Sequence, residues 1–132
     1  MSQDKIADML TNIKNGYLAK KKGVVISWSP INYAVVEVLA LEKYIQGVSK
    51  QERKKGYGEE ILISLRYIDG QRIWENVRQI SKPGKRVYVS VGDLVNYNRR
   101  LGVVIISTSQ GVMTTKMAAK KNLGGELICR IW

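Results

Sequence analysis

Three consecutive hydroxyl side chains follow an apolar run in the second half of the chain. Residues 102–106 are apolar or glycine, and the next five positions form a polar loop composed of Ser107, Thr108, Ser109, Gln110 and Gly111. Small hydroxyls on a tight turn can hydrogen-bond to phosphate oxygens, ribose 2′-hydroxyls and base edges, and a glycine lets the backbone approach a ligand closely. On spacing alone an ordinary Ser/Thr turn is the simpler interpretation. The surroundings of the loop must decide between the two.

The chain around this loop is basic. Lysine and arginine outnumber the acidic residues by 22 to 11, which gives a net charge of +11. Such an excess predicts a polyanionic partner and salt-sensitive binding, with nucleic acid ahead of an acidic membrane or an acidic protein. The excess is larger in residues 67–132 than in residues 1–66. The cations of the second half that can supply the electrostatic part of binding are Lys82, Lys85, Arg86, Arg99, Arg100, Lys116, Lys120 and Lys121.

Two further side chains suit a nucleic-acid surface. Tyr88 follows the basic turn and can stack on an exposed base. Glu126 follows two glycines and can order a neighbouring lysine or accept a hydrogen bond from a base amino group, although a local salt bridge is the simpler interpretation. The tryptophans Trp28, Trp74 and Trp132 are expected in the core or at interfaces instead.

The residues that most enzymes need are missing. The chain has no histidine, which removes the commonest general base and most zinc sites. The carboxylates are scattered, and no two have the spacing of an acid/base pair. The single cysteine, Cys129, lies in an apolar run without a disulfide partner and is expected to be a buried thiol. We therefore predict no catalytic residue, metal, cofactor or small-molecule substrate.

No signal peptide is recognisable at the start of the chain, and no apolar stretch approaches the length of a membrane span. An internal, aqueous and reducing location without a membrane partner is the expectation.

The elements that position these residues indicate an α/β fold of the α+β kind with two small subdomains, residues 1–72 and 73–132. Apolar residues from Ile6 to Tyr17 have helical spacing, with Ser2 or Asp4 placed to cap the helix. A β-branched run at residues 23–28 and a helix opened by Pro30 follow.

The rest of the first subdomain is predicted to be β. Residues 49–58 are polar and charged and are interpreted as a mobile hairpin loop. Residues 60–67 and 72–80 alternate apolar and polar side chains around Asp69-Gly70, a strong hairpin signal. The order of the first subdomain is therefore α-β-α-β-β-β.

The outer face of the first helix is polar and basic. It offers Thr11, Asn12, Lys14 and Asn15, and a lysine run follows at residues 20–22. A solvated face and a phosphate contact explain this pattern equally well.

The second subdomain is predicted to be mainly β with one short helix. Residues 102–107 have the apolar character of a fully buried strand, which resumes after the polar loop at residues 112–113. Thr114 or Thr115 can cap a short helix that runs to Lys121, and Asn122 stands where a left-handed residue is usual. The last strand is expected at residues 126–132.

Taken together, several motifs resemble the small-subunit ribosomal protein S-eight family of bacterial and organellar type. The resemblance runs from end to end of the chain. It is carried by residues 4–16 (DKIADMLTNIKNG), 81–84 (SKPG) with Arg86 and Tyr88, 101–102 (LG), 107–114 (STSQGVMT) and 123–126 (LGGE). Thr115 and Ala119 depart from the family pattern, which commonly has Asp and Arg there, and Asn122 replaces a usual Gly.

This resemblance implies a structural constituent of the small ribosomal subunit, in the cytoplasm or in an organelle, that binds the central domain of 16S-type ribosomal RNA and aids subunit assembly. It implies neighbouring small-subunit ribosomal proteins as partners and, in many bacteria, repression of the protein's own operon messenger RNA. By motif, the polar loop would enter the RNA minor groove. Tyr88, Thr11, Lys14 and Asn15 would add contacts, and Glu126 would support the loop. The RNA-binding residues expected in all are Ser107, Thr108, Ser109, Gln110, Gly111, Tyr88, Lys82, Lys85, Arg86, Thr11, Lys14, Asn15, Lys116 and Glu126.

Two alternatives remain open on the sequence. One is a stand-alone DNA- or RNA-binding repressor module that uses the basic helix and the hairpin around Asp69-Gly70. The other is a small enzyme that uses Cys129 or the carboxylates, which requires a reactive thiol or metal dependence.

Overall fold

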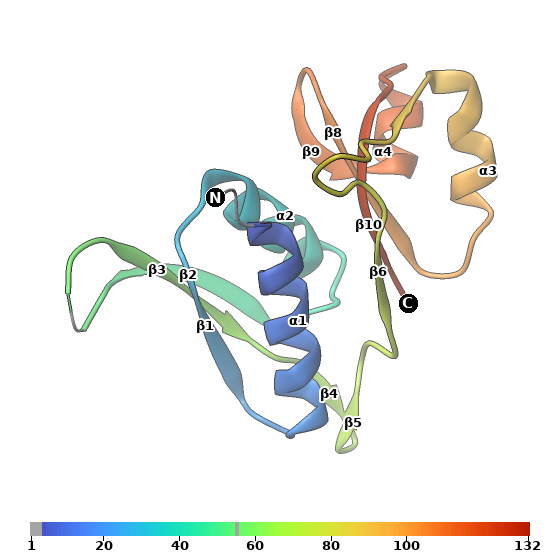
Figure 1. The fold of residues 1–132 in the computed structure, drawn as a ribbon. Helices are drawn as coiled ribbons and strands as arrows, with labels where there is room; N and C mark the ends of the chain where they lie inside the picture. Colours follow the sequence, from blue (N-terminus) through green and yellow to red (C-terminus); the bar gives the residue numbers. More distant parts are fainter. Residues whose placement is uncertain (1–3, 55) are drawn as a thin grey trace. The chain divides into compact units, whose positions relative to one another are not determined.

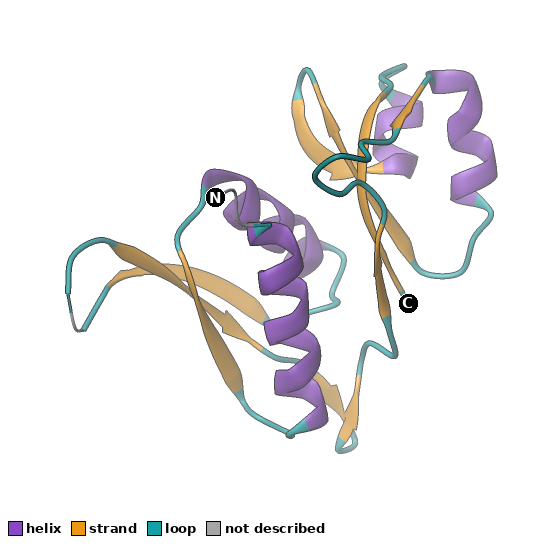
Figure 2. Ribbon diagram, in the orientation of Figure 1, coloured by secondary structure: helices purple, strands orange, loops and turns teal. Residues whose placement is uncertain are grey.

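The computed structural model describes residues 4–54 and 56–132. Ser2, a predicted helix cap, and Lys55, in the predicted mobile loop, lie outside the described residues. The chain folds into a mixed α+β structure with antiparallel sheets, which confirms the predicted fold class (Figures 1 and 2). It divides into two compact units, Met1–Ile73 and Trp74–Trp132, and each is described by itself.

The N-terminal unit packs two helices on a three-stranded sheet with the strand order β1-β3-β2 (Figure 1). Its elements are α1 (Lys5–Leu18), β1 (Gly23–Ser27), α2 (Pro30–Leu41), β2 (Gly47–Glu52), β3 (Glu59–Ser64), β4 (Tyr67–Ile68) and β5 (Gln71–Arg72). Asp4 caps α1 by accepting from the Ala7 N–H at 3.1 Å, and Pro30 opens α2, both as the sequence predicts. The buried side chains of α1 recur at the helical spacing seen in the sequence.

The predictions for the polar segment 49–58 and for the Asp69-Gly70 hairpin had different outcomes. Residues 49–52, expected in a mobile loop, belong to β2, which pairs with β3 along its whole length. That expectation was wrong because an edge strand with one exposed face tolerates polar and charged residues that are otherwise typical of a loop. The hairpin around Asp69-Gly70 is confirmed, and both residues have positive φ, as a tight two-residue turn requires.

The C-terminal unit has a five-stranded antiparallel sheet in which β10 is central (Figure 1). Its elements are β6 (Val77–Gln79), β7 (Tyr88–Val89), the 3-10 helix η1 (Val91–Asp93), α3 (Leu94–Asn98), β8 (Val103–Thr108), β9 (Gly111–Thr114), α4 (Thr115–Lys120) and β10 (Gly125–Ile131). Both β6 and β7 pair with one edge of β10, and β8 pairs with the other. The register between β10 and β8 shifts at a bulge between Leu127 and Cys129.

Two expectations for this region were wrong. A single strand was predicted at residues 72–80. Instead, β5 ends at Arg72 and β6 begins at Val77, with the buried Trp74 between them. The single predicted helix is accompanied by α3, whose five residues are too short to show a helical period and of which only Leu94 is buried. Thr115, one of the departures from the family pattern, donates to Asn98 Oδ1 at 2.7 Å and so links α4 to α3.

The core of this unit lies between its sheet and its helices. It is formed by Leu94, Val104, Ile106, Met113, Ala118 and Leu127. Thr114 caps α4 by accepting from the Met117 N–H at 3.2 Å, and Asn122 has the predicted left-handed φ of 57°. These signals are local, and the sequence predicted them correctly.

We expect Thr114→Ala to lower the free energy of unfolding by about 1 kcal/mol, because the Met117 N–H loses its acceptor. Thr114→Ser should retain most of the stability, and Thr11→Ala, at an exposed position inside α1 where alanine has the higher helix propensity, should not lower it. Urea unfolding of the three variants measures the difference. Equal losses in Thr114→Ala and Thr114→Ser would show that the hydroxyl does not act as a cap.

Candidate nucleic-acid interface

The polar loop is the turn of the β8–β9 hairpin, at the top of Figure 1. Thr108 pairs with Gly111, its Oγ1 donates to the Gly111 carbonyl at 2.8 Å, and the same oxygen accepts from the Gln110 N–H at 3.1 Å. Thr108 thus stabilises the turn. The hydroxyls of Ser107 and Ser109 have no hydrogen-bond partner within residues 4–54 and 56–132. The turn is an ordinary Ser/Thr turn in its geometry, and it leaves two hydroxyls for a ligand.

The glycines Gly124 and Gly125 allow the neighbouring strands to lie close to the start of β10. A Cβ atom on Gly125 would collide with the backbone carbonyl of Ser107, and one on Gly124 would collide with the carbonyl of Val89. Neither glycine has a positive φ, so the requirement is steric. Only glycine lets β10 approach β8 and β7 this closely.

This close approach aligns three of the expected site residues. Glu126 pairs with Ser107 in β8 and with Tyr88 in β7. Because directly opposed residues of an antiparallel pair share a face, the three side chains lie on the same side of the sheet. Arg86 Nη1 lies 3.3 Å from Glu126 Oε2. Glu126 therefore forms a local salt bridge, the simpler of the two interpretations of its sequence position, and its partner is an arginine. We call Ser107, Ser109, Glu126, Arg86 and Tyr88 the loop site.

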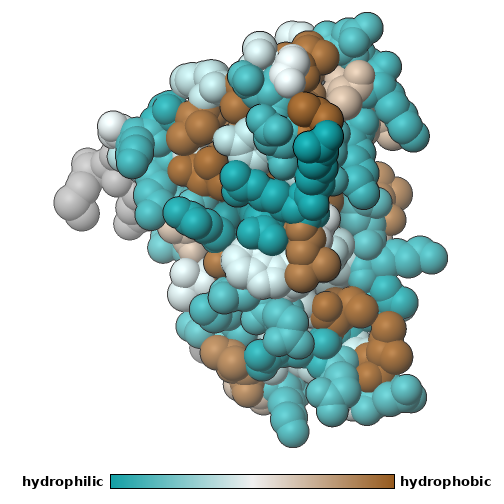
Figure 3. Space-filling view, turned by 90° about the vertical axis from the view of Figure 1, so that its right-hand side faces the viewer, coloured by the Kyte–Doolittle hydropathy of each residue, from teal (hydrophilic) through white to brown (hydrophobic). Residues whose placement is uncertain are grey.

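The loop site combines different chemical groups within a small area. Tyr88 is 70% exposed, and the Arg86 side chain is half exposed. The ring offers a stacking surface, the guanidinium offers a positive charge, and the hydroxyls offer donors and acceptors. In the face shown in Figure 3, apolar side chains form separate patches among hydrophilic ones.

Lys82 and Lys85 do not join the loop site. Their backbones are bridged to each other across a tight turn, and their side chains line a hollow of about 400 Å³ with Arg78, Arg100 and Arg130. Arg78 and Arg130 were not predicted as site residues, because they meet only through the register of β6 with β10. Lys116 is exposed near the start of α4.

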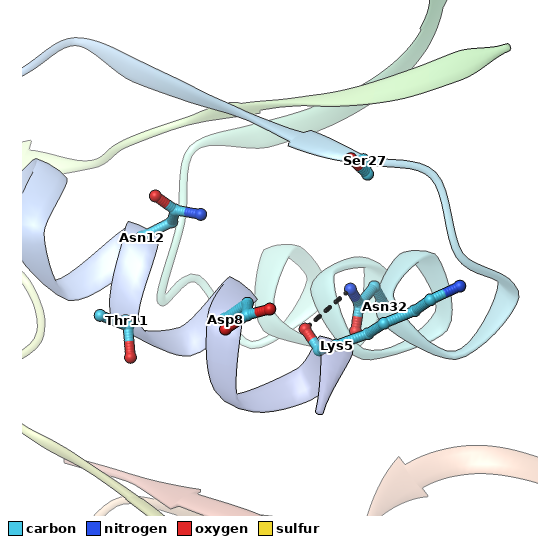
Figure 4. A pocket seen from close by; sticks show the side chains of 6 residues that line it. All are labelled: Lys5, Asp8, Thr11, Asn12, Ser27 and Asn32. Atoms are coloured by element: carbon cyan, nitrogen blue, oxygen red, sulfur yellow. Dashed lines mark hydrogen bonds between the residues drawn. The ribbon is translucent and has the colours of Figure 1, made fainter. Parts of the chain in front are cut away.

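The expected residues of the N-terminal unit lie on α1. Thr11, Lys14 and Asn15 are all exposed. Thr11 lines a hollow of about 430 Å³ together with Lys5, Asp8, Asn12, Ser27 and Asn32, as Figure 4 shows. Lys14 and Asn15 are not among the residues that line it.

Asn32 is the least exposed of the polar residues around this hollow, with an exposed fraction of 4%. Its Nδ2 donates to the Lys5 carbonyl at 3.1 Å, the dashed line in Figure 4, while its Oδ1 is buried and has no partner within the described part of the chain. No signal in the sequence points to Asn32, because an asparagine in an otherwise apolar helix is not informative by itself.

The thiol of Cys129 is buried, as expected. Burial raises its pKa from the ordinary value of 9.0 to about 12, so the thiol stays protonated and unreactive near neutral pH. Within residues 4–54 and 56–132, no group of three or more potential metal-ligating side chains is present. No helix in the same ranges is long and apolar enough to cross a membrane.

Comparison with known proteins identifies the family. Residues 4–132 match the family model described as Ribosomal protein S8. The chain belongs to this family. A small ribosomal subunit protein uS8 of Nitratidesulfovibrio vulgaris is 41% identical over 132 residues, which is 100% of both chains. Proteins of the same name from Cereibacter sphaeroides strains are 41% identical over 129 residues, covering 98% of this chain and 97% to 98% of theirs.

Membership of the Ribosomal protein S8 family confirms the resemblance inferred from the motifs. It also makes this chain a ribosomal protein and not an enzyme. The buried, protonated Cys129 agrees with that assignment.

We expect Gly125→Ala to lower the free energy of unfolding by about 1–3 kcal/mol, because the added methyl group forces β8 away from β10. Gly47→Ala is the matched control, since a Cβ atom there meets nothing within 4 Å. Denaturant unfolding compares the two variants. Equal stabilities would contradict the close approach of the strands.

The buried thiol predicts a pH dependence of stability. Because the folded-state pKa of about 12 lies above the ordinary 9.0, the contribution of Cys129 is fully present below pH 9 and is lost as the pH rises toward 12. Lysines and tyrosines titrate in the same range, so the measured quantity is the difference between the wild type and Cys129→Ala. That difference should shrink above pH 9, and a constant difference would contradict the burial of the thiol.

Proposed function

We propose that this protein is a structural constituent of the small ribosomal subunit that binds the central domain of 16S-type ribosomal RNA directly and aids subunit assembly. The proposal is supported by family membership and by relatives named small ribosomal subunit protein uS8. It needs no cofactor. Its partners are this RNA and neighbouring small-subunit ribosomal proteins.

The RNA contact is supported chiefly by the alignment of Ser107, Glu126 and Tyr88 across three strands. The hydroxyls of Ser107 and Ser109 have no partner in the described part of the chain. The hydroxyls of Ser107 and Ser109 can each donate to and accept from ribose 2′-hydroxyls, which line the wide, shallow minor groove of an RNA helix. Glu126 holds Arg86 beside them, and Thr108 fixes the turn. Each member of the site thus has a separate role.

The exposed ring of Tyr88 favours an irregular helix over a regular duplex. Bases in a regular duplex are stacked and cannot reach a protein ring, whereas bases in bulges and internal loops can be splayed out and stacked on aromatic side chains. Thr11, Lys14 and Asn15 on α1 and Lys116 on α4 would add contacts to the sugar-phosphate backbone.

The same surface would serve in regulation. A messenger RNA of the protein's own operon that folds into a similar irregular helix would bind the same loop site and compete with the ribosomal RNA. Repression would then follow when the protein is in excess over its ribosomal site.

The test compares binding to an irregular helix from the central domain of 16S-type RNA with binding to a regular duplex of equal length. The double variant Ser107→Ala, Ser109→Ala should bind the irregular helix about ten- to a hundredfold more weakly, since each lost hydrogen bond costs roughly 1 kcal/mol. Its binding to the regular duplex should change little, because a regular duplex offers no splayed base to the Tyr88 ring and therefore does not engage the loop site.

Ser49→Ala, at an exposed position of β2, is the control and should bind like the wild type. Equal affinity of the wild type for both RNAs would refute the proposal. A preference for B-form DNA would favour the repressor alternative instead.

A further inference from the structure

The hollow beside β6 and β10 is lined by cations that the loop site does not use. Its side chains include Arg78, Lys82, Lys85, Arg100 and Arg130, and no acidic residue lines it. Its volume is about 400 Å³, large enough for phosphate groups and water. We call this group of five side chains the basic hollow.

Two of these cations face each other directly. Arg78 in β6 pairs with Arg130 in β10 in the antiparallel register. Like charges directly opposite each other destabilise a sheet. No acidic side chain in residues 4–54 or 56–132 forms an ion pair with either guanidinium. The described chain therefore places two like charges together without neutralising them, which indicates an anion from outside.

Two guanidinium groups of the basic hollow, those of Arg130 and Arg100, are held in place by contacts within the chain. Arg130 Nε donates to the Leu101 carbonyl at 3.0 Å, and its guanidinium lies 4.4 Å from the centre of the Trp132 ring. The Arg100 guanidinium lies 4.7 Å from the centre of the Tyr97 ring. These contacts leave the terminal nitrogens of both side chains able to donate to an anion. Side chains positioned before binding lose little entropy when the ligand arrives.

We infer that the basic hollow is a second phosphate-binding site, which takes a further stretch of the backbone of the RNA held at the loop site. The inference rests on the proposed function. A guanidinium forms paired hydrogen bonds with phosphate, and the cluster offers three such groups. Backbone phosphates carry no base identity, so this site adds affinity and orientation but no sequence preference.

Continuity with the loop site favours RNA over an acidic protein segment as the occupant. Lys85 lines the basic hollow, while the next residue, Arg86, reaches Glu126 at the loop site. The turn that carries them connects β6 to β7, and both strands pair with the same edge of β10. A nucleic acid that crosses this edge can contact both the basic hollow and the loop site. An acidic peptide would need only the basic hollow and would make no use of the neighbouring loop site.

The test removes two charges at each of two places. The variant Arg78→Gln, Arg100→Gln changes two exposed residues of the basic hollow. The control variant Lys43→Gln, Lys54→Gln removes the same charge at two exposed positions outside both the loop site and the basic hollow. Binding of each variant to the irregular helix and to the regular duplex is measured over a salt series.

The hollow variant should weaken binding to both RNAs by the same factor. It should also reduce the slope of log affinity against log salt by about 1–2, close to one for each phosphate that the protein no longer neutralises. Its preference for the irregular helix should stay that of the wild type, and the control variant should keep the full slope. Hydroxyl-radical footprinting should show weaker backbone protection at nucleotides other than those affected by Ser107→Ala, Ser109→Ala.

A second hollow variant, Lys82→Gln, Lys85→Gln, guards against a folding defect, because it leaves both arginine–aromatic contacts intact and should behave like the first. The inference is overturned if both hollow variants match the control in slope and footprint. It is also overturned if they bind RNA normally but lose a wild-type affinity for poly-glutamate, which would make the occupant an acidic protein. Failure of the proposed function gives a different result, in which the wild type itself does not prefer the irregular helix.

Discussion

The C-terminal unit depends on the central position of β10 and on the two glycines at its start. Because Gly124 and Gly125 have no side chains, β7 and β8 can both approach the strand at the same level. Glu126 then has a hydroxyl on one side and an aromatic ring on the other. Without this approach, the motif residues would still be present in the chain, but they would not form one surface.

The sequence predicted the elements whose signals are local. The caps Asp4 and Thr114, the proline at the start of α2, the left-handed Asn122 and the Asp69-Gly70 hairpin each follow from the chemistry of a few neighbouring residues. The apolar run of β8 also has a clear signal. The exposed edge strand β2 and the short helix α3 were missed, because in neither does burial impose a pattern on the sequence.

The candidate site shows the same division. The loop, Tyr88 and Glu126 were recognised from residue types and motif order, but their alignment is a matter of strand register, which no single segment encodes. The sequence also grouped Lys82, Lys85 and Arg86 as one basic turn. In the fold, the side chains of the two lysines line a hollow that Arg86 does not. Arg78 and Arg130 lie far apart in the chain, and only pairing of β6 with β10 makes them neighbours.

The bulge between Leu127 and Cys129 determines which residues of β10 face the same side of the sheet. Side chains alternate along a regular strand, so Glu126 and Arg130, four positions apart, would face the same way. The extra residue reverses this alternation. Glu126 pairs with Ser107, whereas Arg130 pairs with Val104, and the side chains of Ser107 and Val104 point to opposite faces of the sheet. One strand can therefore present an acidic side chain on one surface and a basic side chain on the other. Deletion of the extra residue would leave the same pairs with β8, and the two charges, then three positions apart, would still face opposite sides of the sheet. The bulge thus lets the strand carry one more residue without exchanging its faces.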